Sequence, residues 1–206
     1  MNRCFIFAAL NTENLIIKPQ ANDLVIACDK GINNTDKLGI TPNIIIGDFD
    51  SLGFVPDREN IKVLPIRKDD TDVGYAIKYA LDLGYSDFVV YGAVGGSLDH
   101  TFANMQLAHY LCENGARGIF FGGNEAFTAI KNDSLRFKNA RGRVSVFSLS
   151  EKSESVTLNG FDYPLQNATL FSSFPLGVGN SFLGDAEISV QNGTLAVIWS
   201  EKILPY

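Results

Sequence analysis

Short apolar runs recur along the first 122 residues, and most of them end at a polar residue or a glycine. The clearest is Ile44–Ile46, three consecutive β-branched residues followed by Gly47-Asp48-Phe49-Asp50-Ser51. A continuous apolar run of this kind is typical of a strand buried on both faces, as in a parallel sheet covered by helices. Similar runs predict further strands at residues 4–10, 23–28, 61–66, 88–91 and 118–122.

Helical spacing appears between these runs. Five apolar residues between Val73 and Leu81 fall on one face of a helix, and Gly84 follows as a terminator. We also predict that the Gly92–His100 segment opens a second helix, which runs to about residue 114 and is ended by Gly115, and that residues 32–38 form a short helix ended by Gly39. Strands that alternate with helices predict an α/β unit with a mainly parallel sheet.

The pattern changes beyond about Ser134. Short strand-like runs are separated there by Gly, Asn, Ser and Pro, at residues 143–149, 155–158, 168–171, 186–191 and 194–199. The absence of a helical period predicts an all-β unit. Asn192-Gly193, between two alternating runs, predicts a type I′ hairpin that pairs the last two strands. We therefore expect two domains, residues 1–133 and residues 134–206.

Composition and charge narrow the classes of function. The 206 residues are 46% hydrophobic and 19% charged, as in a globular protein, and the net charge of -6 argues against a nucleic-acid partner. No stretch approaches the ~18 apolar residues of a membrane span, so we expect no membrane partner. Cys4, Cys28 and Cys112 are too widely spaced for a zinc or disulfide framework, which favours a cytoplasmic location.

Carboxylates follow two of the predicted strands. Asp29 comes after the strand at 23–28, and Asp48 and Asp50 come after Ile44–Ile46. The carboxyl ends of parallel strands share one edge of a sheet, so these acids should lie near one another. If the chain stays extended past Gly47, Asp48 and Asp50 point the same way and Phe49 turns toward the core. Such a pair suits Mg²⁺ bound with substrate phosphates, although an ordinary turn explains the residues equally well.

Two further segments should reach the same edge. The Lys68–Asp72 cluster precedes one predicted helix, and the Gly92–His100 loop opens the next. Backbone N–H groups of a glycine-rich loop beside a helix N-terminus fit a phosphate, but this loop is neither a Walker A loop nor a dinucleotide fingerprint. The alternative is that the Gly92–His100 loop is only a tight turn from a strand to a helix. The acids before the first helix could also serve as its cap.

Together, in order and spacing, these motifs resemble the thiamine pyrophosphokinase family. The matching segments are Asp29-x-Gly31-x-Asn33, Gly47-Asp48-Phe49-Asp50-Ser51, Lys68-Asp69-x-Thr71-Asp72, Gly92-x-x-Gly95-Gly96-x-x-Asp99-His100 and Gly179-Asn180-Ser181-Phe182. The chain departs from the family pattern where Lys30 replaces Gly, Ser97 replaces Arg, and Gly179 and Ser181 replace Ser and Glu. The lost arginine removes a positive charge directed at phosphate.

The resemblance implies an ATP- and Mg²⁺-binding α/β catalytic domain at residues 1–133. It also implies a β-sandwich at residues 134–206 for thiamine binding and dimerisation, and a homodimer. The implied reaction transfers the diphosphoryl group of ATP to the hydroxyl of thiamine, giving thiamine diphosphate and AMP. By motif, the catalytic carboxylates are Asp48, Asp50, Asp72 and Asp99, of which the first three bind the metal; the ATP-binding residues are Asp29, Lys68, Thr71, Gly92, Gly95 and Gly96; and the thiamine-binding residues are Asn180 and Ser181. Asp72 and Asp99 are both candidates for accepting the hydroxyl proton.

Two other functions stay open. The acids could serve a Mg²⁺-dependent phosphohydrolase, or another phosphotransferase that acts on a different small molecule. The chain could also be a non-catalytic module that binds a nucleotide or thiamine, although binding alone rarely needs so many carboxylates. AMP release that depends strictly on thiamine would separate the kinase from the hydrolase.

Overall fold

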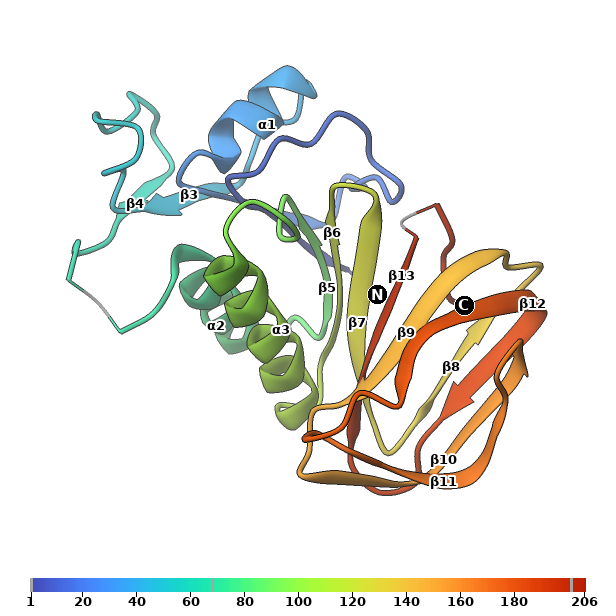
Figure 1. Cartoon of the computed structure of the whole chain (residues 1–206). Helices are drawn as coiled ribbons and strands as arrows, with labels where there is room; N and C mark the ends of the chain where they lie inside the picture. Colours follow the sequence, from blue (N-terminus) through green and yellow to red (C-terminus); the bar gives the residue numbers. More distant parts are fainter. Residues whose placement is uncertain (1, 68, 201) are drawn as a thin grey trace. The chain divides into compact units, whose positions relative to one another are not determined.

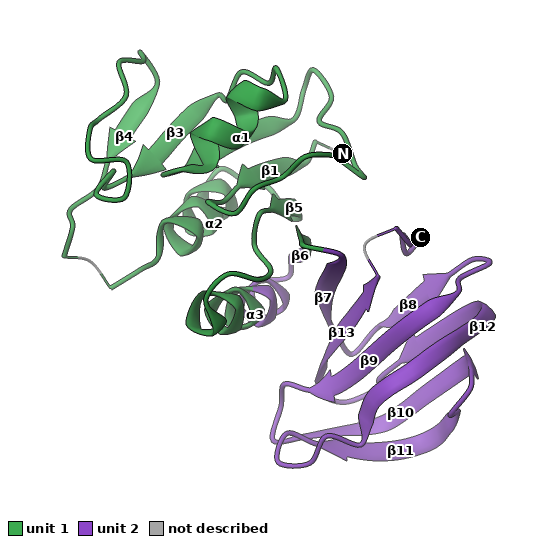
Figure 2. Cartoon of the chain, turned by 45° about the horizontal axis from the view of Figure 1, so that its top comes forward, with its two compact units in different colours: residues 1–107, 118–123 green, residues 108–117, 124–206 purple. Residues whose placement is uncertain are grey.

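The computed structural model describes residues 2–67, 69–200 and 202–206, so Lys68 lies outside the described part of the chain. The chain forms two compact units, residues 1–107 with 118–123 and residues 108–117 with 124–206 (Figure 2). Within the described residues, no helix is both long enough and apolar enough to cross a membrane.

The first unit is built on a sheet with the strand order β6-β5-β1-β2-β3-β4. Figure 1 labels β6, β5, β3 and β4 of this sheet. Its strands are β1 (Cys4–Phe7), β2 (Leu24–Cys28), β3 (Ile44–Gly47), β4 (Ile61–Val63), β5 (Asp87–Tyr91) and β6 (Arg117–Gly122); its helices are α1 (Gly31–Lys37), α2 (Asp72–Asp82) and the start of α3 (Leu98–Glu113). The pairs β5-β1, β1-β2, β2-β3 and β3-β4 are all parallel. The predicted mainly parallel sheet and its three helices are therefore confirmed.

The core of this unit explains why the apolar runs form strands. Phe5, Ile6 and Ile26 on the two central strands are completely buried, as a sheet covered on both faces requires. Aromatic rings extend the packing across three strands, because Tyr91 stacks on Phe7 with ring centroids 5.6 Å apart and on Phe121 with centroids 5.0 Å apart. The strands β1 and β4 end three residues earlier than we predicted.

The apolar face and the N-cap of α2 explain why this segment forms a helix. The predicted apolar residues Val73, Ala76, Ile77 and Ala80 are buried. Thr71 is the N-cap, and its Oγ1 accepts a hydrogen bond from the backbone N–H of Gly74 at 3.0 Å. This bond satisfies one of the N–H groups that lack a partner in the first turn of a helix.

The second unit is an antiparallel β unit with the strand order β11-β10-β12-β9-β13-β7, and β8 pairs with β12. Its strands are β7 (Glu125–Lys131), β8 (Ser134–Phe137), β9 (Gly142–Ser148), β10 (Lys152–Phe161), β11 (Leu165–Phe171), β12 (Gly177–Ser189) and β13 (Thr194–Ser200). Phe137 lies at its centre, with its ring centroid 4.8 Å from that of Phe182 and 5.4 Å from that of Trp199. The predicted all-β character is confirmed, whereas the strands β7 and β8 were not predicted.

The predicted hairpin at Asn192-Gly193 is wrong. Among the described strands, β13 pairs with β7 and β9, and β12 pairs with β8, β9 and β10. Gly193 instead exchanges hydrogen bonds with Asn132, since its N–H donates to Asn132 Oδ1 at 2.9 Å and its carbonyl accepts from Asn132 N at 3.1 Å. A contact with a distant part of the chain has replaced the local pairing.

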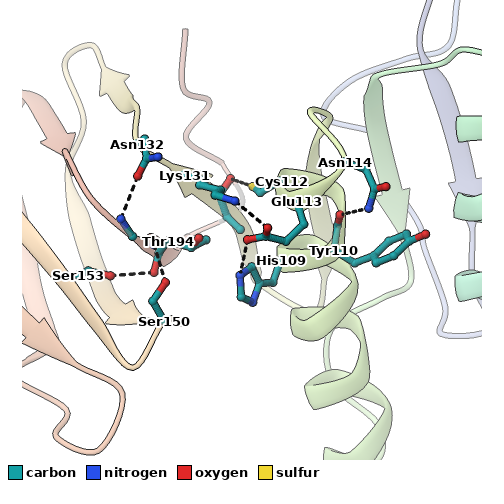
Figure 3. A network of polar contacts seen from close by, with 12 residues as sticks. His109, Tyr110, Cys112, Glu113, Asn114, Lys131, Asn132, Ser150, Ser153 and Thr194 are labelled. Atoms are coloured by element: carbon teal, nitrogen blue, oxygen red, sulfur yellow. Dashed lines mark hydrogen bonds and ion pairs between the residues drawn. The ribbon is translucent and has the colours of Figure 1, made fainter.

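Residues 108–113 of α3 belong to the second unit and are held to β7 by polar contacts (Figure 3). The Lys131 ammonium donates to Glu113 Oε2 at 2.6 Å, and His109 Nε2 lies 3.2 Å from Glu113 Oε1. The Cys112 thiol donates to Ala129 O at 3.3 Å. The Lys131 hydrogen bond holds the pKa of Glu113 below its usual value.

Candidate functional site

A cavity of about 210 Å³ lies in the first unit, at the carboxyl ends of β1, β2 and β5 and at the starts of α2 and α3. It is lined by Ala8, Ala9, Leu10, Cys28, Asp29, Thr71, Asp72, Val73, Gly92, Ala93, Gly95, Ser97, His100 and Asn104. The expectation that several loops meet at one edge of the sheet is therefore confirmed for Asp29, the start of α2 and the glycine-rich loop, but not for Asp48 and Asp50, which do not line the cavity. Of the predicted site residues, the cavity gathers Asp29, Thr71, Asp72, Gly92 and Gly95.

Asp29 is a buried carboxylate in the wall of this cavity. Only 9% of the residue is exposed, and its backbone N–H donates to Ile46 O at 2.9 Å. One carboxylate oxygen, Oδ2, accepts a hydrogen bond from Ser51 Oγ. The other, Oδ1, is buried and has no hydrogen-bond partner among the residues that the structure describes. Because an unpartnered buried carboxylate oxygen is costly, this atom indicates a place for a cation or a hydrogen-bond donor from a ligand.

The segment after β3 turns instead of staying extended, so the turn, one of the two alternatives left open by the sequence, is confirmed. Phe49 has a φ of +58°, and the N–H groups of Leu52 and Gly53 donate to its carbonyl. The backbone therefore turns directly after β3. Phe49 is 2% exposed and packs into the core, as expected.

Asp48 and Asp50 lie on this turn rather than in the wall of the cavity. Asp48 is half-buried, Asp50 is exposed, and Asp50 N donates to Asp48 Oδ1 at 3.3 Å. The adjacent hydrogen bond from Ser51 to Asp29 ties the turn to the residue that follows β2. The side chain of Ser51 thus connects the turn to the wall of the cavity.

Asp72 begins α2 and lies beside Cys28, whose thiol donates to Asp72 O at 3.6 Å. Burial raises the pKa of Cys28 well above its usual value, and the charge of Asp72 raises it further. Cys28 is therefore a neutral thiol and a poor nucleophile. Asp70, two residues before Asp72, forms an ion pair with Lys78 at 2.6 Å.

The glycine-rich loop joins β5 to α3. The backbone N–H of Gly95 donates to Thr101 Oγ1 at 3.1 Å, which holds the loop to the first turns of α3. Asp99 is exposed and outside the cavity, as is Gly96. Hydrogen bonds from Ser97 and from the backbone N–H of His100 hold the pKa of Asp99 below its usual value.

Three polar residues of the cavity wall, Ser97, His100 and Asn104, were not among the predicted site residues. Asn104 is 8% exposed, and its Nδ2 donates to Ala93 O at 2.8 Å. An asparagine within the predicted helix that ends near residue 114 was its signal in the sequence, because the carbonyl that it contacts comes from another element.

The predicted thiamine-binding residues belong to β12 in the second unit. Asn180 is 4% exposed, and its side chain is engaged with the turn between β10 and β11. Its Oδ1 accepts from Tyr163 N at 2.9 Å, and its Nδ2 donates to Tyr163 O at 2.7 Å. Ser181, the next residue, is half-buried and donates its backbone N–H to Asn180 Oδ1 at 2.8 Å.

The donor chemistry of the cavity suits a hard cation, although a complete set of ligands is not assembled. Outside residues 1, 68 and 201, no group of three or more His, Cys, Asp or Glu side chains is close enough to hold a metal. Asp29 and Asp72 nevertheless contribute carboxylates to one cavity, and Mg²⁺ is commonly held by one or two carboxylates together with substrate phosphates and water. These residues fit a metal that arrives with a phosphate ligand.

Comparison with known proteins shows similarity along almost the whole chain. Two family models match, the catalytic domain of thiamin pyrophosphokinase at residues 19–120 and the vitamin B1 binding domain of thiamin pyrophosphokinase at residues 135–195. The thiamine pyrophosphokinase of Bacillus subtilis is 28% identical over 187 residues, which are 86% of this chain and 87% of that protein.

Solved structures show the same fold. A thiamine pyrophosphokinase structure from Bacillus subtilis superposes with a TM-score of 0.82 at 25% identity, covering 97% of this chain and 99% of that chain. Thiamin pyrophosphokinase from Candida albicans shares the fold at only 14% identity, with a TM-score of 0.78 and coverage of 97% and 89%. Since the two family models together span well over half of the 206 residues, the chain belongs to the thiamin pyrophosphokinase family.

Proposed function

We propose that this protein is a thiamine diphosphokinase, which transfers the diphosphoryl group of ATP to the hydroxyl of thiamine and releases AMP. The observation that carries this proposal is the match of both family domains, in order, to a chain whose first domain has carboxylates around one cavity. A phosphohydrolase or a binding module would not require the vitamin B1 binding domain and the catalytic domain together.

The proposal assigns the nucleotide and the metal to residues 1–133. The phosphates lie beside Gly92, Gly95 and Thr71, where backbone N–H groups and the N-termini of α2 and α3 favour negative charge. Lys68 would add a positive charge. Asp29 would belong to this ATP-binding set together with Gly96.

Magnesium would be held by Asp48, Asp50 and Asp72. When bound, it neutralises charge on the phosphates during transfer. The buried, unpartnered Oδ1 of Asp29 supports a cation nearby. The turn that carries Asp48 and Asp50 is tied to Asp29 through Ser51, which links these acids to the wall of the cavity.

The thiamine hydroxyl must lose a proton during the transfer. Asp99 and Asp72 are the two candidate acceptors. Asp72 lines the cavity, whereas Asp99 is exposed and outside it. Because Asp72 is also a proposed metal ligand, and a carboxylate next to a cation is a weaker base, both residues stay candidates for accepting the proton.

Residues 134–206 form the proposed thiamine-binding and dimerisation domain, in which Asn180 and Ser181 face thiamine. A homodimer would cover apolar surface that is exposed in the second unit. The exposed large apolar side chains between residues 163 and 183 are Tyr163, Phe171, Phe174, Leu176, Val178 and Leu183.

One assay tests this function. Purified protein is incubated with ATP, Mg²⁺ and thiamine, and thiamine diphosphate, AMP and ADP are measured together. The proposal predicts thiamine diphosphate and AMP in equal amounts, and no AMP when thiamine is left out. ADP as the product would indicate transfer of a single phosphoryl group, and AMP formed without thiamine would indicate a hydrolase.

A further inference from the structure

One wall of the cavity has no regular secondary structure of its own. Ala8, Ala9 and Leu10 line the cavity directly after β1 ends at Phe7. The backbone of a segment outside the sheet needs other hydrogen-bond partners, and those partners determine where the wall lies. We call residues 8–12 the β1 wall.

A single side chain from α1 supplies most of these partners. Asn34 Nδ2 donates to Ala8 O at 2.9 Å and to Leu10 O at 2.8 Å. Its Oδ1 accepts from the backbone N–H of Thr12 at 3.1 Å. Both ends of the amide are therefore bonded to the β1 wall, and the residue is only 2% exposed. Hydrogen bonds shielded from water in this way restrict a segment more firmly than exposed ones.

The helix that carries Asn34 is itself held close to β1. A Cβ atom on Gly31, the first residue of α1, would lie 1.9 Å from Phe7 O, so only glycine allows this approach. The side-chain amide of Asn34 is therefore held in a fixed position relative to β1. Asn34 does not line the cavity, and its influence on a ligand must pass through the β1 wall.

The carbonyl oxygens of the β1 wall also lie against the glycine-rich loop. A Cβ atom on Gly92 would lie 2.5 Å from Leu10 O and 2.9 Å from Ala8 O. These are the two carbonyl oxygens that accept hydrogen bonds from Asn34. A displacement of either carbonyl would therefore move the first residue of the proposed phosphate-binding loop.

We propose that Asn34 is a positioning residue for ATP, which holds the β1 wall and, through it, the start of the glycine-rich loop. The assignment of ATP as the ligand rests on the proposed function. Asn34 touches no substrate, so its loss should misplace binding groups without removing any of them. Misplacement of this kind weakens binding even when the protein remains folded.

The test compares two variants with the same change of chemistry. Asn34→Asp keeps the size of the side chain and the acceptor for Thr12, but it turns a carboxylate oxygen toward two carbonyl oxygens. Asn60→Asp is the matched control, because Asn60 Nδ2 donates to Pro42 O at 2.6 Å, before β4 and away from the cavity. Asn34→Asp removes two hydrogen bonds from a side-chain amide to backbone carbonyls, and Asn60→Asp removes one of the same kind.

Steady-state kinetics separate positioning from simple destabilisation. A smaller folded fraction lowers the apparent kcat and leaves the KM unchanged, whereas a displaced wall raises the KM for ATP. We expect Asn34→Asp to raise the KM for ATP at least about tenfold, and Asn60→Asp to change it by less than about twofold. The KM for thiamine should stay within about twofold in both variants.

Each outcome decides the proposal. An unchanged KM for ATP in folded Asn34→Asp, or an equal rise in Asn60→Asp, overturns it. If Asn34→Asp does not fold, Asn34→Ala takes its place, and failure of both variants to fold overturns the positioning role. If the wild-type protein makes no thiamine diphosphate, the proposed function fails separately, and calorimetric titration with ATP and Mg²⁺ decides whether Asn34→Asp alone weakens binding about tenfold.

Discussion

Replacing Gly92 with alanine tests whether the glycine-rich loop must lie against the β1 wall. Gly92 has a φ of +70°, and its added Cβ atom would lie 2.5 Å from Leu10 O and 2.9 Å from Ala8 O. Both oxygens are held by Asn34, so neither can move away without losing a buried hydrogen bond. The substitution therefore combines backbone strain with a steric overlap.

The free-energy costs of the backbone strain and of the steric overlap can be worked out separately. A left-handed backbone conformation costs a residue with a Cβ atom about 1–2 kcal/mol. Forcing an extra methyl group into packed atoms typically costs about 1–3 kcal/mol more. We therefore expect Gly92→Ala to lower the free energy of unfolding by about 2–5 kcal/mol.

Gly39→Ala provides the matched control. Gly39 has a φ of +67°, but no heavy atom lies within 4 Å of the position of its Cβ atom. Its replacement should therefore cost only the backbone strain, about 1–2 kcal/mol. Urea unfolding followed by far-UV circular dichroism measures both free energies by linear extrapolation. Equal losses in the two variants would show that the β1 wall does not press on Gly92, and would refute this packing.

Three further predictions concern other parts of the chain. Thr71→Ala removes the N-cap of α2 and should lower the free energy of unfolding by about 1 kcal/mol, measured by urea unfolding; no loss would contradict the capping role. The pKa of Glu113 is lowered in the folded state by its bond with Lys131, so its contribution to stability is present above the usual value of 4.5 and is lost as pH falls through the folded-state pKa. Glu113→Gln should accordingly flatten the decline of stability with acid, and an unchanged pH profile would contradict this contribution. Burial raises the pKa of Cys112 to about 11, so its alkylation by iodoacetamide at pH 8, followed by mass spectrometry, should be at least about tenfold slower in the folded protein than in urea; equal rates would refute this.

The elements that could be predicted are those whose signal is local. The helix α2 combines apolar spacing with a terminating glycine, and β3 is a run of β-branched residues, so both follow from short stretches of sequence. The strands β7 and β8 were missed, although β7 has five consecutive buried residues. The partners of Asn192-Gly193 were predicted wrongly because strand pairing depends on distant segments.

The candidate site likewise has features that could be predicted from the sequence and features that could not. The order of strands places Asp29, Asp72 and the glycine-rich loop at one edge of the sheet, and this could be predicted from the topology of parallel sheets. The positive φ of Phe49 could not be predicted, because residues other than glycine rarely adopt a positive φ. The buried amide of Asn34 could not be predicted either, since all three of its partners lie more than twenty residues away in the sequence.

The account depends most on the claim that the carboxylates around the cavity carry out the transfer. The most direct test compares thiamine diphosphate formation by Asp72→Asn and Asp70→Asn, because Asp72 lines the cavity and Asp70 is paired with Lys78. We predict that kcat/KM falls at least about 100-fold in Asp72→Asn. In Asp70→Asn it should stay within about threefold of the wild-type value. Undiminished activity in folded Asp72→Asn, or an equal loss in both variants, would contradict the account.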